Sequence, residues 1–517
     1  MIADSASARA ERIRATELAG APEDRARALS LWRTRAAVLI ATATLARLLV
    51  ITTTGLANGE AYYYVWSRFP SWSYYDHPPL VAWMVWLTTR FSDAEVWIRV
   101  GPVLCSTAFA VLVYRLAERL FSARAAFVAV AIVTLLPVYF VSSYALNPEA
   151  PLAPLWVLFL LILEGMREND EGWRPIAAGF VAGAAFMAKY SGLLLLGVAL
   201  AYVVASPRAR RWLRRPSLYT GPLVALLVVT PVIAWNQARG WPSLALHFVE
   251  RRASPEAGSL AHNVATVLLG QLGALHPLVF PGLLFVLAVA VRRAKSDDRF
   301  RFLALASGPV LLFFFTAMVS VRDPEPHWTM VGYVPLAIAA GGLLDELGDR
   351  PPVAVRWYVG ASVASGLLAI VLTYAYSRAP RLRTLLPESM YDPTKDVFNE
   401  MTGWDELRGT LHQEVSRLGD GAVVASCQYA LCAHLSQTLE EHPPVYCPSE
   451  RRTEFDFIDR GEPPPSAPVL YVTDDHYHDE ASLRLPGREC EPLRAVRVER
   501  DGVVMRHYYL EACGPKR

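Results

Sequence analysis

The stretch Asn58-Gly59-Glu60-Ala61-Tyr62-Tyr63-Tyr64 follows the first long apolar segment of the chain, and Tyr74-Tyr75-Asp76-His77-Pro78-Pro79 comes shortly after it. Together the two stretches place two acids, a histidine and a cluster of tyrosines at one edge of that apolar segment. Acidic side chains beside a bilayer are costly unless they are paired or functional. These residues therefore mark the predicted functional edge of a membrane protein, and later short motifs return to the same edge.

The composition is typical of a protein with many membrane-spanning helices. The chain has 517 residues, of which 53% are hydrophobic and 19% are charged, and its formal net charge is +2. A charge so close to neutral excludes the large basic field that nucleic-acid-binding proteins present. A helix needs about 20 apolar residues to cross a bilayer. Windows of about this length without a charged residue are Ala125–Leu146, Leu218–Trp235, Val264–Val291, Phe302–Val321 and Trp357–Ser377.

The apolar pattern predicts eleven spans and the basic residues predict their orientation. Loops rich in arginine and lysine stay in the cytoplasm, and this bias places the N-terminal tail, residues 1–31, inside. Residues 175–207 are too long for one span, so we expect a break at Lys189. The segment Pro78–Phe91 is too short to span and carries tryptophans, so we expect it to lie along the membrane surface. The predicted spans are residues 33–55, 96–118, 125–146, 150–164, 175–188, 191–206, 217–235, 264–291, 302–321, 328–345 and 355–377.

The last part of the chain has a different character. Residues 378–517 are charged, contain prolines and lack long apolar runs, which predicts a soluble α/β domain on the outer face after a transmembrane domain over residues 32–377. The fold class is thus a multi-spanning all-α membrane protein with a C-terminal α/β domain. The expected strands are Gly421–Ser426, Pro468–Thr473 and Val503–Leu510, and the expected helices are Trp404–Leu418 and Tyr429–Leu439.

Cysteines are concentrated in this C-terminal part. Five of the six cysteines lie there, which indicates an oxidising compartment. Cys490 and Cys513 bracket a predicted hairpin, and a bridge between them is the first choice. Cys427, Cys432 and Cys447 allow another. The run Asp474-Asp475-His476-Tyr477-His478 carries groups that bind metals, but a polar turn after a strand is the favoured interpretation.

Six short motifs occur in an order that resembles a known family. The chain is similar to the polyprenyl-phosphate-dependent glycosyltransferases with the GT-C fold. It resembles most the bacterial relatives of the protein O-mannosyltransferases and of the enzymes that add aminoarabinose or galacturonic acid to lipid A. The matching motifs are Glu60-Ala61-Tyr62-Tyr63, Tyr75-Asp76-His77-Pro78-Pro79-Leu80, Asn147-Pro148-Glu149-Ala150-Pro151-Leu152, Ala188-Lys189-Tyr190-Ser191-Gly192, Trp235-Asn236 and Pro326-His327-Trp328.

The resemblance implies that an acid in the first outer loop acts as general base, and Glu60 occupies that position. An acceptor hydroxyl must lose its proton as it attacks the sugar, so the chemistry needs such a group. Many relatives have two adjacent acids here, whereas this chain has Gly59 before Glu60. The structural alternative is that Glu60 caps a surface helix that begins at Ala61.

The same resemblance suggests roles for the remaining motif residues. Asp76 and Glu149 are further candidate catalytic acids. His77 and Lys189 are candidates for binding the donor phosphate, with Arg47 as either a phosphate ligand or one half of a structural ion pair. The structural alternatives are capping of the Pro-Pro turn for Asp76 and His77, and snorkelling of Lys189 to the membrane interface. For His327 and Trp328 the alternative is anchoring in the interfacial aromatic belt. Further candidate substrate-binding residues are Tyr62, Tyr63, Asn236, His327 and Trp328.

These expectations combine into one function with two rivals. The chain is expected to be an inverting glycosyltransferase of a bacterial inner membrane. It would move one sugar from a polyprenyl-phosphate donor to an acceptor hydroxyl on a lipid, glycan or protein at the periplasmic face. A divalent metal is allowed through Asp76, but the sequence shows no metal-ligand spacing. The rivals are a lipid-linked sugar flippase or transporter and an inactive relative that only binds.

Overall fold

The computed structural model describes residues 22–168, 170–250, 260–321, 324–385, 391–394, 396–458 and 461–516. The chain divides into two compact units. The first, here called the helical unit, comprises residues 1–48, 102–144 and 148–370. The second, here called the mixed unit, comprises residues 49–101, 145–147 and 371–517, so the first loop of the chain belongs with the C-terminal part.

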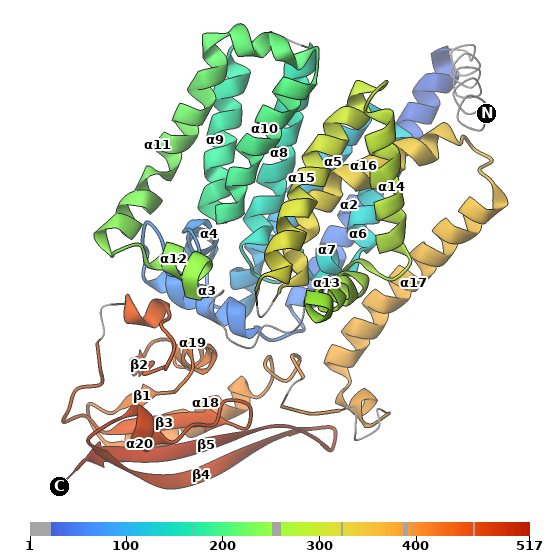
Figure 1. Ribbon diagram of the computed structural model, residues 1–517. Helices are drawn as coiled ribbons and strands as arrows, with labels where there is room; N and C mark the ends of the chain where they lie inside the picture. The colour runs from blue at the N-terminus through green and yellow to red at the C-terminus, as the bar shows by residue number, and fades with distance from the viewer. Residues whose placement is uncertain are drawn as a thin grey trace. The chain divides into compact units, whose positions relative to one another are not determined.

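The helical unit is built almost entirely from apolar helices (Figure 1). Several of them pack side by side, with α9 against both α8 and α11, and α16 against α6 and α15. Its helices, three of which run on into the mixed unit, are α2 (Pro22–Ile51), α5 (Glu95–Leu120), α6 (Ala123–Leu135), α7 (Pro137–Ser142), α8 (Glu149–Glu168), α9 (Trp173–Ala188), η1 (Tyr190–Leu193), α10 (Leu194–Ala205), η2 (Ala209–Arg214), α11 (Pro216–Ala238), α12 (Pro242–Ala245), η3 (Leu246–Glu250), α13 (Leu260–Leu275), α14 (Val279–Arg293), α15 (Asp298–Val319), η4 (Pro326–Thr329), α16 (Met330–Glu346) and α17 (Val353–Arg378).

The helices agree with the predicted multi-spanning protein. Within the described residues, seven helices are long and apolar enough to cross a membrane, and three further apolar helices are shorter. The predicted break at Lys189 is present, since α9 ends at Ala188 and η1 begins at Tyr190. The predicted span 264–291 is made of two helices, α13 and α14, which meet at an angle of 101°. His276 has a positive φ of 78° at this bend, and Pro277 follows it. The exact number of crossings remains a prediction.

Glycine allows two of these helices to touch along their backbones. A Cβ atom on Gly179 of α9 would overlap the carbonyl of Gly221 in α11, and a Cβ on Gly221 would press on the carbonyl of Pro175. Membrane helices commonly use small residues for such close packing, because lipid supplies no hydrophobic drive between them. The α9–α11 pair therefore depends on the absence of side chains at these two positions.

The mixed unit is organised around one five-stranded sheet. Its strand order is β2-β1-β3-β5-β4, with β1 parallel to both of its neighbours and β5 antiparallel to β3 and β4. The three predicted strands correspond to β1, β3 and β5, and the two predicted helices to α18 and α19, whereas β2 and β4 were not predicted. The elements are α3 (Asn58–Arg68), α4 (Leu80–Thr88), η5 (Pro380–Leu385), α18 (Trp404–Leu418), β1 (Val423–Ala425), α19 (Tyr429–Thr438), β2 (Val445–Tyr446), η6 (Glu454–Asp456), β3 (Val469–Asp474), α20 (Ala481–Arg484), β4 (Arg488–Arg500) and β5 (Val503–Pro515).

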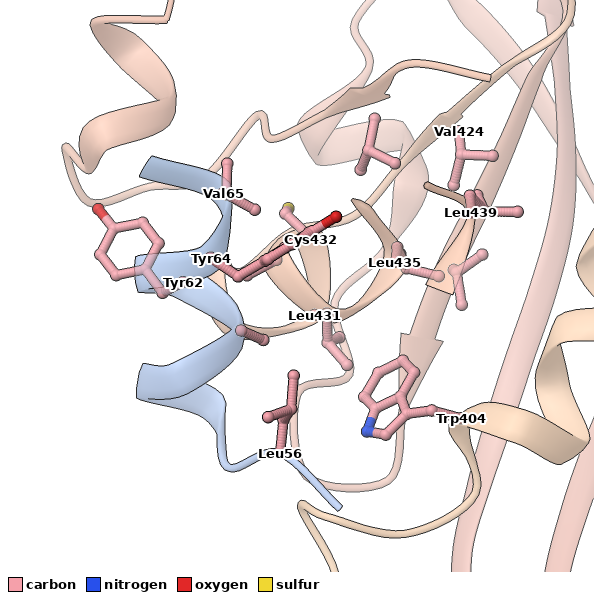
Figure 2. Close-up of a cluster of buried hydrophobic side chains, with 14 of the residues drawn as sticks. Leu56, Tyr62, Tyr64, Val65, Trp404, Val424, Leu431, Cys432, Leu435 and Leu439 are labelled. Carbon is pink, nitrogen blue, oxygen red and sulfur yellow. The ribbon is translucent and has the colours of Figure 1, made fainter. Parts of the chain in front are cut away.

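A buried apolar cluster joins the first loop to the C-terminal part of the mixed unit. Figure 2 shows Tyr64 and Val65 of α3 near Leu431 and Cys432 of α19. Trp66 of α3 is fully buried in the same cluster. Burying a large side chain contributes roughly 1.5–3 kcal/mol. The loop that carries Glu60 and Asp76 is therefore held by C-terminal residues, and its conformation depends on them.

Two disulfides lie within the C-terminal part. Cys490 and Cys513 are directly opposite each other in the β4–β5 pair and are bonded, which confirms the predicted bridge. Cys432 of α19 is bonded to Cys447, just after β2. Cys427 is a buried free thiol, and Cys105 of α5 is also free. The oxidising compartment of this part of the chain remains a prediction.

Candidate active site

Glu60 is buried in a network that occupies both of its carboxylate oxygens. Its side chain is 2% exposed and forms an ion pair with Arg99 of α5, which is fully buried. Oε1 accepts hydrogen bonds from Arg99 Nε at 2.7 Å and from the backbone N–H of Leu146 at 2.8 Å. Oε2 accepts from Arg99 Nη2 and from the backbone N–H of Ala57 at 2.8 Å.

This network gives Glu60 a structural role. Ala57 is the N-cap of α3 and Glu60 is its third residue, so the carboxylate satisfies an amide that the helix leaves unpaired. The capping that the sequence allowed is thus present, although the helix begins at Asn58 rather than at Ala61. The sequence reasoning missed Arg99, whose one signal was a charge inside an apolar segment. The role of Glu60 as a base remains a prediction.

Asp76 lies in a second network that includes the C-terminal part of the mixed unit. The hydroxyl of Tyr62 donates to Asp76 Oδ2 at 3.0 Å and accepts from the backbone N–H of Glu454 at 2.5 Å. Oε2 of Glu454 accepts from the backbone N–H of Tyr75 at 2.6 Å, and Arg451 Nη2 lies 3.8 Å from Asp76 Oδ1. Burial, followed by the charge of Asp76, raises the pKa of Tyr62 well above its ordinary value, so the phenol stays protonated as a donor.

His77 and Tyr63 lie beside this network. The Tyr63 ring is 6.3 Å from the His77 ring and 4.9 Å from the ring of Trp66. Tyr62 packs on Phe455 at 6.1 Å and on Tyr429. The sequence reasoning brought Tyr62, Asp76 and His77 to one edge, but it gave no signal for Glu454, which begins the short helix η6, 379 residues after Tyr75.

Glu149, Lys189 and His327 meet in the helical unit. Glu149 is the first residue of α8, Lys189 follows the end of α9, and His327 lies in η4. Glu149 Oε1 forms an ion pair with Lys189 Nζ and lies 3.2 Å from His327 Nε2. The ring centre of Trp328 is 5.9 Å from Lys189 Nζ. Three sequence-predicted residues are therefore brought together, and a phosphate would share Lys189 with Glu149.

Arg47 and Asn236 are both buried in the helical unit. Arg47 of α2 is 4% exposed and lines a cavity that Glu149 also lines. Asn236, near the end of α11, holds the turn into α12. Its Nδ2 donates to the carbonyl of Val232 at 3.1 Å, and its Oδ1 accepts from the backbone N–H of Ser243 at 3.3 Å. These contacts satisfy Asn236 within the protein and favour a structural role.

The candidate residues fall into two groups, one in each unit. Glu60, Tyr62, Tyr63, Asp76 and His77 belong to the mixed unit. The helical unit holds Arg47, Glu149, Lys189, Asn236, His327 and Trp328. Across the part of the chain that the structure describes, no group of three or more histidine, cysteine or acidic side chains is arranged to hold a metal ion. This applies to Asp76 and to the acidic and histidine residues after β3.

Comparisons of sequence find similarity to proteins whose names describe sugar transfer. Residues 76–235 match the family described as dolichyl-phosphate-mannose-protein mannosyltransferase. Lipid A galacturonosyltransferase RgtD of Rhizobium johnstonii is 26% identical over 287 residues, which is 55% of this chain and 60% of that relative. The undecaprenyl phosphate-alpha-4-amino-4-deoxy-L-arabinose arabinosyl transferase of Edwardsiella ictaluri is 29% identical over 329 residues, 58% of this chain and 55% of that relative. The matches thus span little more than half the length of these relatives.

The fold agrees with the sequence matches. The crystal structure of ArnT from Cupriavidus metallidurans bound to undecaprenyl phosphate has a TM-score of 0.63 and 18% identity, and the match covers 92% of this chain and 97% of ArnT. The apo structure of the same protein has a TM-score of 0.60. The chain is therefore similar in sequence to these glycosyltransferases and shares the fold of ArnT.

Proposed function

We propose that the protein transfers a single sugar from a polyprenyl-phosphate donor to an acceptor hydroxyl at the periplasmic face of a bacterial inner membrane. The observation that carries this proposal is the sequence similarity, at 26% and 29% identity, to two relatives whose names describe sugar transfer to lipid A or from undecaprenyl phosphate. A lipid A-like acceptor fits these relatives best. The ArnT-like fold supports the same function.

The proton acceptor in this proposal is a carboxylate of the first outer loop. The resemblance gives the role to Glu60, but a carboxylate that already accepts four hydrogen bonds can take a proton only if its pair with Arg99 opens. The side chain of Asp76 is 17% exposed, whereas that of Glu60 is 2% exposed. Glu60 is therefore the candidate from the family pattern, and Asp76 is the candidate that the contacts favour.

The transfer experiment uses purified protein in lipid nanodiscs with a panel of polyprenyl-phosphate sugars and lipid A. The expected result is release of polyprenyl phosphate together with a glycosylated acceptor. Asp76→Asn or Glu60→Gln should slow turnover about 10²- to 10⁴-fold, depending on which carboxylate is the base. Asp420→Asn, at an exposed position after α18, is the matched control. Absence of transfer with every donor would refute the function, and movement of intact donor across a vesicle bilayer would support a flippase.

A further inference from the structure

The side chain of Arg47 is buried in the helical unit without a protein partner for two of its nitrogens. It is 4% exposed, and its Nε and Nη1 atoms are both inaccessible and make no hydrogen bond to any described residue. Arg47 lies about one turn before the end of α2 at Ile51. A buried guanidinium without a counter-charge is strongly unfavourable, and such residues in membrane proteins are mostly functional. The structure therefore points to a group outside the protein that satisfies Arg47.

A cavity beside Arg47 provides the space for such a group. Its lining includes hydroxyl side chains from α5, α6 and the end of α7, namely Ser106, Thr134, Ser142 and Ser143. The cavity measures about 20 Å³. One water-sized group needs about 10–15 Å³, so one or two oxygen atoms at the end of a larger ligand fit there, but a sugar ring does not. The guanidinium of Arg47 in its wall favours an oxyanion over an apolar group.

Glu149 lines the same cavity and leaves one oxygen available. Lys189 and His327 both contact Oε1, which fixes the carboxylate, whereas Oε2 is buried and makes no hydrogen bond to a described residue. Arg47 and Glu149 do not lie within the 4.0 Å of an ion pair. The cavity thus has an unsatisfied cation and an unsatisfied acceptor that do not neutralise each other. A ligand that presents an oxyanion next to a hydroxyl would satisfy both.

We propose that this cavity binds an oxyanion of the sugar donor to Arg47, while a hydroxyl of the donor sugar donates to Oε2 of Glu149. The oxyanion is either the carboxylate of a uronic acid or the phosphate of the carrier, and both present the same chemistry to a guanidinium. This inference rests on the proposed function and adds the class of donor to it. Arg47 acts as a binding residue and has no part in proton transfer.

The binding experiment compares three lipids on the purified protein. They are undecaprenyl phosphate alone, undecaprenyl phosphate carrying galacturonic acid, and undecaprenyl phosphate carrying glucose. If Arg47 binds the phosphate, Arg47→Met should weaken all three about 10- to 100-fold. If Arg47 binds the sugar carboxylate, only the galacturonic acid lipid should weaken by this factor. Equal affinities of Arg47→Met and the wild type for all three lipids would overturn the inference and leave a water as the partner.

Thermal stability and two further variants, Arg35→Met and Arg47→Lys, distinguish a loss of binding from a folding defect. Arg47→Met should raise the thermal stability of the ligand-free protein, because it removes an uncompensated buried charge. Arg35→Met, at an exposed position of the same helix, should change neither stability nor affinity. Arg47→Lys keeps the positive charge but lacks the planar guanidinium that donates two parallel hydrogen bonds. This variant should therefore retain part of the affinity. Sugar transfer with unchanged binding in Arg47→Met would refute this inference alone, whereas Arg47-dependent binding without transfer would refute only the proposed function.

Discussion

Arg99 and Glu60 form a buried ion pair that ties the first part of α5 to the first turn of α3. Their side chains are 0% and 2% exposed, and Arg99 also donates to the carbonyl of Thr54 at 2.7 Å. The pair therefore fixes the loop that precedes α3 as well as the helix itself. This relationship explains why an acid is needed at position 60 even before any catalytic role is considered.

A double variant of Glu60 and Arg99 separates the structural role of Glu60 in the ion pair from its predicted role as the base. Glu60→Gln and Arg99→Met should each lower the free energy of unfolding by about 3–5 kcal/mol, because each leaves a buried partner without its counter-charge. The double variant Glu60→Leu/Arg99→Met should recover most of that loss, as measured by thermal unfolding in detergent. Asp93→Asn, which removes the exposed pair with Arg68, is the control and should cost no more than about 1 kcal/mol. A double variant with wild-type turnover would show that Glu60 is not the base.

Lys189 should affect stability as well as donor binding. Lys189→Met removes the ion-pair partner of the buried Glu149, so it should destabilise the protein, and Lys189→Met/Glu149→Leu should restore the stability. If Lys189 also contacts the donor phosphate, this stable double variant should still bind donor weakly in a direct binding assay. His77→Ala tests the second predicted phosphate ligand in the same assay. Normal donor affinity in both variants would move the phosphate site elsewhere.

Mass mapping of the unreduced protein should find two disulfides. The expected links are Cys490–Cys513 and Cys432–Cys447, with Cys105 and Cys427 recovered as free thiols. Replacing Cys490 and Cys513 with serine should lower stability by about 2–5 kcal/mol. Recovery of all six cysteines as thiols from protein made in its native membrane would contradict the oxidising compartment.

The stability of the mixed unit should fall in mild acid because of His434. The His434 ring is 1% exposed and stacks on Trp404 with 4.3 Å between ring centres. Burial, reinforced by the positive charges of Arg506 and Arg99, lowers the pKa of His434 well below its ordinary value. The unfolded chain therefore binds a proton below pH ~6.5 that the folded protein does not, so stability decreases as the pH falls.

The size of this effect can be measured by chemical unfolding between pH 7.5 and 5. The contribution of one histidine is at most about 1.4 kcal/mol per pH unit. His434→Phe should reduce the slope by up to this amount, because phenylalanine keeps the stacking and takes up no proton. His412→Phe, at an exposed position of α18, is the control and should leave the slope unchanged. An identical slope in the wild type and in His434→Phe would contradict the assignment.

The orientation of the chain can be tested with reporter fusions. The arginine-rich segment before α11 predicts that a fusion after Ser217 lies in the cytoplasm, and a fusion after Arg378 should lie in the periplasm. Activity of both reporters on the same side of the membrane would refute the predicted orientation and, with it, the periplasmic transfer.

The sequence by itself determined the helices, the central strands and one disulfide. Uncharged windows such as Phe302–Val321 identify helices that match α15, because burial in lipid requires apolar side chains all round the helix. Alternation and β-branched residues identified β3 and β5. The hairpin between Cys490 and Cys513 was expected, but the bounds of β4 were not, because its residues are largely exposed and charged and carry no apolar period.

Only the tertiary structure decided which charges meet. Glu60 and Arg99 are 39 residues apart, and Tyr75 and Glu454 are 379 residues apart, so no local spacing relates them. The bend at His276 also depends on packing, since the apolar run there continues without interruption. The sequence showed that Arg47 and Glu149 need partners, because charges in apolar segments are costly. The fold decided that Glu149 finds Lys189 and His327, whereas Arg47 faces a cavity.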